Sequence, residues 1–322
     1  MRFRILALTI GLAACAAPGG AKAPAYHLIP GSIPPDKGPD GNTVVLDAPR
    51  GLIVVDSGRH PEHSAAILAY AKARGRPIAA VVNTHWHLDH TTGNHDLRQV
   101  FPRAEVYATT AVDGALATFL KRSRAQSEQA LADPKTPPAA KAEIVRGHSV
   151  IDHPERLRPT RPVLQSGRIA VAGRRLDVRV AHLAATEDDL WIYDPKTKVA
   201  IVGDLVVGIV PFMDTACPDG WAKALDAIAA TPFTTLIPGN GEPMTRTDFL
   251  QWRTAYTNLV ACARSSADKA QCVTGWRRDA ARFIDDAHRG YVGEALDYYI
   301  DTRLRSSAEE QQRYCKPLNA GT

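Results

Sequence analysis

Three histidines and one aspartate within six residues are the side chains best suited to chemistry in this sequence. They form the pattern His85-x-His87-x-Asp89-His90. Imidazole nitrogens and carboxylate oxygens are ligands that zinc accepts, and a catalytic zinc keeps one position open for water. Because residues i and i+2 of an extended chain point the same way, His85 and His87 can hold one ion, while Asp89 and His90 turn toward a second. Two such ions would lower the pKa of a bound water towards neutrality.

The loop follows an apolar strand predicted over residues 78–83, which comes after a hairpin (42–47 and 51–56) and a helix that begins at His60 and ends near Gly75. This order indicates an α/β arrangement with a site at the carboxyl end of a strand. A second buried strand, 199–202, leads into Gly203-Asp204-Leu205, which makes Asp204 a further candidate ligand. Other predicted elements are helices at 110–131, 139–146 and 221–230, strands at 169–180, 190–193 and 235–237, and a loop or lid at 147–162.

These motifs resemble the metallo-β-lactamase superfamily of hydrolases. The resemblance covers about residues 42–246 and rests on the HxHxDH loop, on the strand that ends at Asp56-Ser57-Gly58, and on the Gly-Asp-Leu segment. It implies a four-layer αββα fold of the α/β class that binds one or two zinc ions. Asp204 would be the ligand that two ions share, and Asp56 would have a structural role. It also implies that metal-activated water attacks a carbonyl substrate such as a β-lactam, lactone or thioester. Asp204 and Asp89 would then be catalytic, orienting the water and moving its proton.

Two late ligands of the family pattern are replaced. The sequence has Ala185 where the third ligand of the first metal is expected, and Asn240 in place of a histidine in the turn Pro-Gly-Asn-Gly. Asn240 can coordinate through its amide oxygen or serve as a turn residue. His182 lies three residues before Ala185, so it needs a bulge to reach the site. His148 and His153 in the lid are weaker alternatives, and we expect metal binding to persist with a weak second site.

Two other function classes stay open beside the hydrolase. One is a non-catalytic metal-binding or scaffolding protein of the cell envelope that keeps the fold. The other is metal-dependent redox or cofactor-handling work, like that of quinoprotein-associated superfamily members. Small molecules are the expected substrates in the hydrolase interpretation. Nucleic acid is not an expected partner, because the chain has no clustered basic stripe with interleaved aromatic residues.

The first 14 residues resemble a lipoprotein signal peptide. Arg2 and Arg4 precede a short apolar stretch, and Leu-Ala-Ala-Cys ends at Cys15, the expected lipidation site. Ala21-Lys22-Ala23 is an alternative cleavage site. Without residues 1–14 the formal charge falls from +5 to +3, since the rest of the chain has 37 Lys and Arg and 34 Asp and Glu. We therefore expect a periplasmic protein held at the membrane by a lipid anchor alone, with a tether at residues 15–41.

Four further cysteines remain, and an even number in an oxidising compartment permits two disulfides. We favour Cys262–Cys272, which closes a short loop, and Cys217–Cys315, which fastens the C-terminus. The sequence beyond residue 246 has no counterpart in the resemblance. Residues 247–322 are expected to form a helical C-terminal extension, including helices at 248–263 and at 280–304 with an interruption near Gly290.

Overall fold

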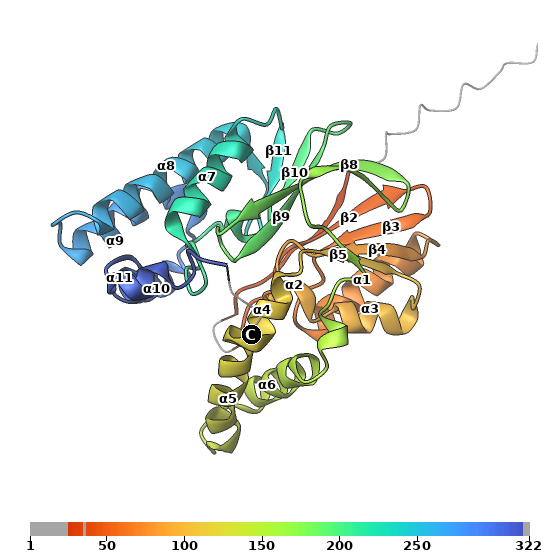
Figure 1. Ribbon diagram of the computed structural model, residues 1–322, viewed down its shortest axis with the longest axis horizontal. Helices are drawn as coiled ribbons and strands as arrows, with labels where there is room; N and C mark the ends of the chain where they lie inside the picture. Colours follow the sequence, from red (N-terminus) through yellow and green to blue (C-terminus); the bar gives the residue numbers. More distant parts are fainter. Residues whose placement is uncertain (1–24, 35–36, 318–322) are drawn as a thin grey trace, which may run out of the picture.

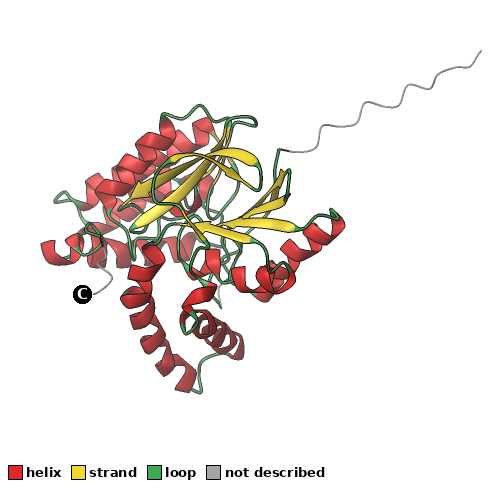
Figure 2. Ribbon diagram, turned by 45° about the vertical axis from the view of Figure 1, so that its right-hand side comes forward, coloured by secondary structure: helices red, strands yellow, loops and turns green. Residues whose placement is uncertain are grey.

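The computed structural model describes residues 25–34 and 37–317. Two six-stranded sheets face each other, and helices cover both outer faces, so the predicted αββα architecture is confirmed (Figures 1 and 2). The first sheet has the order β1-β2-β3-β4-β5-β6 and the second β12-β11-β10-β9-β8-β7. The strands are β1 His27–Ile29, β2 Thr43–Ala48, β3 Gly51–Val55, β4 Ile78–Val82, β5 Glu105–Ala108, β6 Arg161–Pro162, β7 Gly167–Val171, β8 Arg174–His182, β9 Asp188–Asp194, β10 Val199–Ile201, β11 Thr235–Ile237 and β12 Met244–Thr245.

Successive side chains of the central strands alternate between two cores, as the pleat of a strand requires. Ile53 and Val55 of β3 point into the core between the sheets, whereas Val54 packs against the outer helices. The strands are buried on both faces, which explains their continuously apolar sequences. The sheets therefore fix the positions of the segments that follow β3 and β4.

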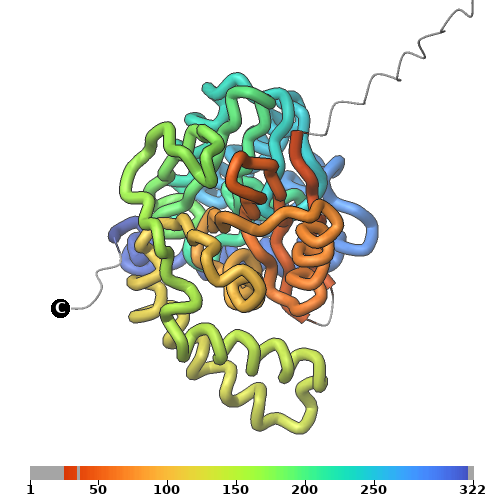
Figure 3. Tube along the Cα trace, turned by 90° about the vertical axis from the view of Figure 1, so that its right-hand side faces the viewer, coloured from red at the N-terminus to blue at the C-terminus, as the bar shows by residue number. Residues whose placement is uncertain are grey.

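The helices cover the two outer faces and form one projecting hairpin. On the first sheet lie α1 Pro61–Ala73, α2 Leu88–Thr91 and α3 Asn94–Val100; on the second lie α7 Pro218–Ala229 and α8 Arg246–Ala263. Between β5 and β6 of the first sheet, the chain forms α4 Ala111–Ala117, α5 Phe119–Ala132 and α6 Pro138–Ile151. Helices α5 and α6 form an arm that projects from the body (Figure 3). The chain ends with α9 Lys269–Asp279, α10 Arg289–Tyr299, a π-helical turn at Ile300–Leu304, and α11 Ala308–Gln312.

Several local expectations are corrected by the structure. The lid expected at 147–162 is mostly ordered secondary structure, because α6 continues to Ile151 and is followed by a 3-10 turn at Pro154–Arg156 and then β6. The strand expected at 169–180 is a hairpin that turns at Ala172 and Gly173, both with positive φ. The helix expected at 280–304 begins only at Arg289, so its interruption precedes Gly290. Within the expected tether, β1 pairs with β2 and is part of the first sheet.

Three tryptophans connect the C-terminal half of the fold to the stretch that follows Asp204. The indole N–H of Trp221 donates to the carbonyl of Leu205 at 2.9 Å, that of Trp252 to Val207 at 2.7 Å, and that of Trp276 to Ile209 at 3.0 Å. All three rings are fully buried in a single hydrophobic core, which lies against the outer face of the second sheet. Helices α7, α8 and α9 thus fix the path of the chain beyond Asp204.

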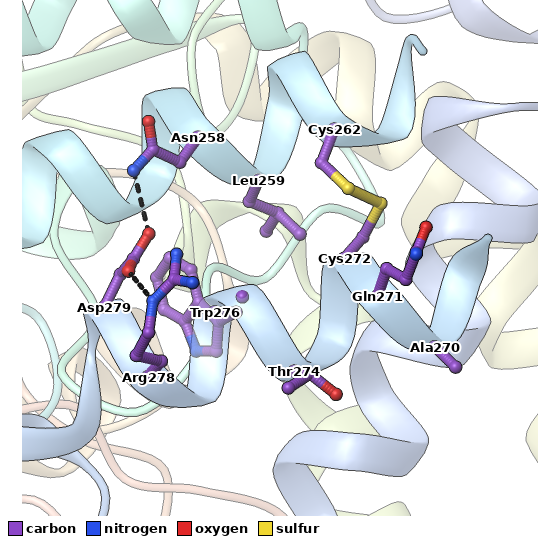
Figure 4. A pocket seen from close by; sticks show the side chains of 11 residues that line it. Asn258, Leu259, Cys262, Ala270, Gln271, Cys272, Thr274, Trp276, Arg278 and Asp279 are labelled. Carbon is purple, nitrogen blue, oxygen red and sulfur yellow. Dashed lines mark hydrogen bonds and ion pairs between the residues drawn. A yellow bond between two sulfur atoms is a disulfide. The ribbon is translucent and has the colours of Figure 1, made fainter. Parts of the chain in front are cut away.

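Both predicted disulfides, Cys262–Cys272 and Cys217–Cys315, are confirmed. Figure 4 shows Cys262–Cys272 joining α8 to α9 beside a pocket whose charged residue Asp279 is already bonded to Asn258 and Arg278. Disulfides are typical of oxidising compartments and indicate an extracytoplasmic protein. None of the helices in the described ranges combines the length and apolar character needed to cross a membrane. The expected signal peptide and Cys15 lie outside the described residues.

Candidate metal centre

The candidate ligands come from the ends of parallel strands in both sheets. His85 and His87 follow β4, and Asp89 and His90 lie in α2 directly after them. Asp204 follows β10 and Asn240 follows β11, and these two strands are parallel neighbours. The side chain of Asn42 joins the halves by donating to the carbonyls of Pro238 at 3.0 Å and Gly241 at 2.8 Å. Ligands far apart in sequence are therefore brought together at the strand ends. We refer to this largely buried position between His85, Asp89, Asp204 and Asn240 as the crevice.

Two groups of side chains in this crevice could each hold a metal ion, and they share Asp204. The first comprises His85, His87 and Asp204, and the second Asp89, His90 and Asp204. Within each group the ligand atoms lie within 4.8 Å of one another. Nε2 of His90 lies 3.2 Å from an oxygen of Asp89 and 3.2 Å from one of Asp204. The structure thus assembles the residues that the sequence analysis selected into the expected pairs.

The protonated nitrogen of His87 is fixed by a residue that the sequence analysis missed. The hydroxyl of Thr215 lies 2.9 Å from the carbonyl of Ala185 and 3.0 Å from Nε2 of His87. A carbonyl can only accept, so Thr215 donates its proton to Ala185 and accepts one from Nε2 of His87. The lone pair of His87 is therefore on Nδ1, as a metal ligand requires.

Asp56 fixes the other two imidazoles in the same way. The hydroxyl of Thr84 donates to Asp56 at 2.7 Å, so it accepts from Nδ1–H of His85 at 3.0 Å and leaves Nε2 with the lone pair. Nδ1 of His90 donates to Asp56 at 2.8 Å. Asp56 has a φ of 59°, a strained value for a non-glycine residue that is common near functional sites. Its expected structural role near the metals agrees with these contacts.

Charge in the crevice favours a cation. Burial lowers the pKa values of His85 and His87, which keeps both rings neutral and able to act as ligands. Burial also opposes the charge on His90, but the carboxylates of Asp204, Asp89 and Asp56 raise its pKa well above the usual range. A divalent cation would balance the same carboxylates after displacing that proton.

Asn240 points into the crevice rather than serving only as a turn residue. Its amide nitrogen donates to Asp204 at 3.3 Å, and its Oδ1 is buried without a hydrogen-bond partner in the described structure. The preceding Gly239 lets the turn approach this closely, because a Cβ at that position would collide with a carboxylate oxygen of Asp204. The position of the amide oxygen is consistent with the predicted weak ligand.

The alternative histidines do not reach the crevice. His182 is exposed at the end of β8, and its Nδ1 lies 2.5 Å from Asp188. His148 of α6 bonds to Ser127 at 2.7 Å, and His153 is exposed beside Glu155. Among the described residues no imidazole replaces the one missing at Ala185. The space next to His87 is instead occupied by the hydroxyl of Thr215.

The residues present fit a metal ion. Buried atoms that face the cluster lack hydrogen-bond partners within the described part of the chain, namely His85 Nε2, Asp204 Oδ2 and Asn240 Oδ1. Unsatisfied buried polar atoms are costly, so their convergence requires an explanation. Nitrogen and carboxylate donors of this kind suit zinc.

Comparison with known proteins agrees with the resemblance noted in the sequence. The sequence model described as "Metallo-beta-lactamase superfamily" matches residues 37–260. A linear primary-alkylsulfatase from Pseudomonas sp. (strain ATCC 19151) is 25% identical over 277 residues, which cover 78% of this chain and 47% of that protein. An atrochrysone carboxyl ACP thioesterase from Passalora fulva is 40% identical over 65 residues, 20% of each chain. The chain thus spans half or less of the length of these curated relatives.

Solved structures show the same fold. A stereoselective inverting sec-alkylsulfatase from Pseudomonas sp. superposes with a TM-score of 0.51 at 20% identity, covering 69% of this chain and 40% of that one. A metallo-β-lactamase from Hirschia baltica has a TM-score of 0.50 at 19% identity, with 72% of this chain and 92% of the other covered. At these identities the likeness concerns the fold alone.

Proposed function

This chain belongs to the metallo-β-lactamase superfamily, and from that premise we propose that it is a metal-dependent hydrolase with zinc as the resident metal. The observation that carries the proposal is the state of the three imidazoles. Thr215, Thr84 and Asp56 hold a proton on the outer nitrogen of His87, His85 and His90 respectively. Outer partners of this kind orient metal ligands and raise their basicity.

The residues of the chain have distinct roles in this proposal. His85, His87 and Asp204 would hold one ion, and Asp89, His90 and Asp204 a second with help from Asn240. A bound ion would supply a Lewis acid and lower the pKa of a coordinated water. The charge on His90 lowers the pKa of Asp89 despite burial, so this carboxylate is ionised and able to serve as a metal ligand. In this proposal Asp89 also helps to position the water. Asp204 is held by the amide of Asn240 at 3.3 Å.

Small esters and related acyl compounds are the proposed substrates. The relatives include, by name, an alkylsulfatase and an acyl-carrier-protein thioesterase, so sulfate esters join the β-lactams, lactones and thioesters already expected as classes to test. Phe119 of α5 lies beside the metal loop, with its ring 5.4 Å from that of Trp86 and 6.5 Å from that of His87. It would form part of the wall against which a substrate packs. We further propose a periplasmic location with a lipid anchor at Cys15.

The test is zinc content measured together with turnover on these four substrate classes. We expect stoichiometric zinc and hydrolysis of at least one class, both lost in His87→Ala. His182→Ala is the matched control, because His182 is exposed and outside the crevice, and it should keep both properties. A protein that is free of zinc and inert would refute the hydrolase and favour a binding or scaffolding role. Uptake of a redox-active metal such as iron in place of zinc, with electron transfer and no hydrolysis, would favour the redox alternative.

A further inference from the structure

Five charged side chains of alternating sign run from the N-terminal segment to the metal loop. Asp40 Oδ2 lies 2.7 Å from His60 Nδ1, and His60 Nε2 lies 3.4 Å from Glu143 Oε2. Glu143 Oε1 lies 2.6 Å from Arg59 Nη1, and Arg59 Nη2 lies 3.8 Å from Asp89 Oδ1. The series ends on a candidate ligand of the second metal position.

All five side chains are largely buried, with at most 22% of any one exposed. Buried charges are stable only when they are paired and hydrogen-bonded. Burial opposes the charges, but hydrogen bonds lower the pKa of Asp40 to about 2 and that of Glu143 to about 2. Hydrogen bonds to Asp40 and Glu143 raise the pKa of His60 to about 9, against burial and the charge of Lys37. Asp40, His60 and Glu143 are therefore charged at neutral pH.

The geometry gives the two oxygens of Asp89 different neighbours. Oδ1 faces Arg59 at 3.8 Å, while Oδ2 faces His90 at 3.2 Å. A carboxylate held this way presents one oxygen to the metal cluster and keeps the other on the guanidinium. An unbalanced guanidinium beside a metal position would repel the ion, and Glu143 supplies the compensating negative charge.

Glu143 lies on α6, in the arm that projects from the body. The same helix also contacts the backbone of Arg59 itself, because Nε of Arg146 donates to the carbonyl of Arg59 at 2.6 Å. Glu143 in addition accepts from the backbone N–H of Gly38 at 2.7 Å. The position of Arg59 therefore depends on a helix remote in sequence from every candidate ligand.

We propose that Arg59 is a positioning residue for Asp89, and that Glu143 of α6 holds Arg59 in the orientation that the second metal position needs. This inference rests on the proposed function only in that the cluster binds metal; it does not require hydrolysis. It assigns the projecting arm a role in metal binding through one ion pair.

Stepwise zinc binding, measured by competition with a chromophoric chelator, tests the inference on the full chain. In Glu143→Gln and in Arg59→Met we expect the weaker zinc step to lose about tenfold in affinity, the usual effect of losing an outer partner of a ligand. The tighter step, held by His85 and His87, should be unchanged. The visible spectrum of the Co²⁺-substituted protein should change in the same two variants. Glu128→Gln is the matched control, because Glu128 lies in α5 of the same arm but is half-exposed and pairs with Arg124.

The contradicting outcomes are equally specific. Unchanged affinity of both steps in the two variants would overturn the inference, as would an equal loss in both steps or in Glu128→Gln. Wild-type protein that takes up only one zinc ion would also overturn it, since Asp89 would then have no separate ion to hold. Wild type that binds two ions but hydrolyses nothing would refute the proposed function and leave this measurement valid. Arg59→Lys, which keeps the charge, should retain more affinity than Arg59→Met and guards against a folding defect.

Discussion

The hydroxyl of Thr215 lies 3.0 Å from Nε2 of His87 and fixes the tautomer of that ring. The two residues are 128 positions apart in sequence. Thr215 occupies the neighbourhood of Ala185, where the family pattern has a histidine, and bonds to the carbonyl of Ala185 at 2.9 Å. Beside the position where the histidine ligand is missing, Thr215 thus keeps His87 in the tautomer that can bind a metal.

Thr215→Val removes this hydroxyl and keeps the shape of the side chain. Nε2 of His87 then loses its acceptor, so the ring is free to adopt the other tautomer and to rotate. We expect zinc affinity of the first position to fall by about 10- to 100-fold. Chelator competition measures this change, and Thr257→Val on the exposed face of α8 is the control. Equal zinc affinity in Thr215→Val and wild type would show that the contact does not orient the ligand.

Asn240→His restores the imidazole that the family pattern has in this turn. Imidazole is a better zinc ligand than a neutral amide oxygen, and Asn240 already points at Asp204. We expect the second zinc step to tighten by about tenfold, which corresponds to about 1.4 kcal/mol. Isothermal titration with zinc is the measurement, and Asn258→His in α8 provides a distant comparison. Unchanged occupancy of the second position would mean that the turn does not face the metal.

Gly239→Ala tests the close approach of the turn to Asp204. The added Cβ would collide with Oδ1 of Asp204 and with the backbone at Gly203 and Asp204. Because Asp204 belongs to both ligand groups, both zinc steps should weaken, and turnover should be lost. Gly275→Ala is the matched control, since nothing lies within 4 Å of a Cβ there and alanine favours the helix by about 0.5–1 kcal/mol. Full zinc uptake by Gly239→Ala would contradict the arrangement described for Asp204.

The pH dependence of stability should reveal His60. Its pKa is raised to about 9 by Asp40 and Glu143, so its contribution is complete below pH 6.5 and disappears as pH rises through 9. Because one pKa unit corresponds to about 1.4 kcal/mol and His60 is buried, the loss should be on the order of a few kcal/mol. Urea unfolding from pH 6 to 10 should show this loss in wild type and in His153→Asn, but not in His60→Asn. Parallel curves for wild type and His60→Asn would contradict the assignment.

Lowering the pH should also reduce the stability of the fold, through Asp40 and Glu143, the partners of His60. The pKa values of Asp40 and Glu143 are lowered to about 2. Their contribution is present above their ordinary pKa values near 4 and is lost as pH falls towards 2. The same unfolding measurements, extended to low pH, should show less acid sensitivity in Glu143→Gln than in wild type.

Much of the fold and the core of the site could be predicted from local patterns. The strand before His85 is continuously apolar, and the HxHxDH spacing is specific enough to select four clustered residues. Asp204 was found because Gly-Asp-Leu follows another apolar strand. These signals are all contained in a few consecutive residues, so they do not depend on knowing how the sheets pack.

The remainder depends on contacts between distant segments. The sequence around Thr215 and Arg59 contains no motif that marks them as functional. Their roles come from contacts made only in the folded chain, of Thr215 with His87 and of Arg59 with Asp89. The extent of α6 was underestimated because Gly147 and the later prolines resemble loop residues, whereas Val150 is buried against the hydrophobic group that contains Trp86. His182 has a suitable residue type, but it is the last residue of β8, and the register of β8 with β9 places it opposite Asp188 with its side chain exposed.

The three tryptophans described above also determine how the site depends on the rest of the fold. The carbonyls of Leu205, Val207 and Ile209 lie in a 3-10 turn, an isolated bridge to Asn240 and a bend. Each of these buried carbonyls accepts an indole N–H from a different helix. A buried carbonyl that loses its donor costs free energy. Displacement of any one of the three helices would therefore destabilise the segment that follows Asp204, so the C-terminal helices and the candidate metal centre should lose their structure together.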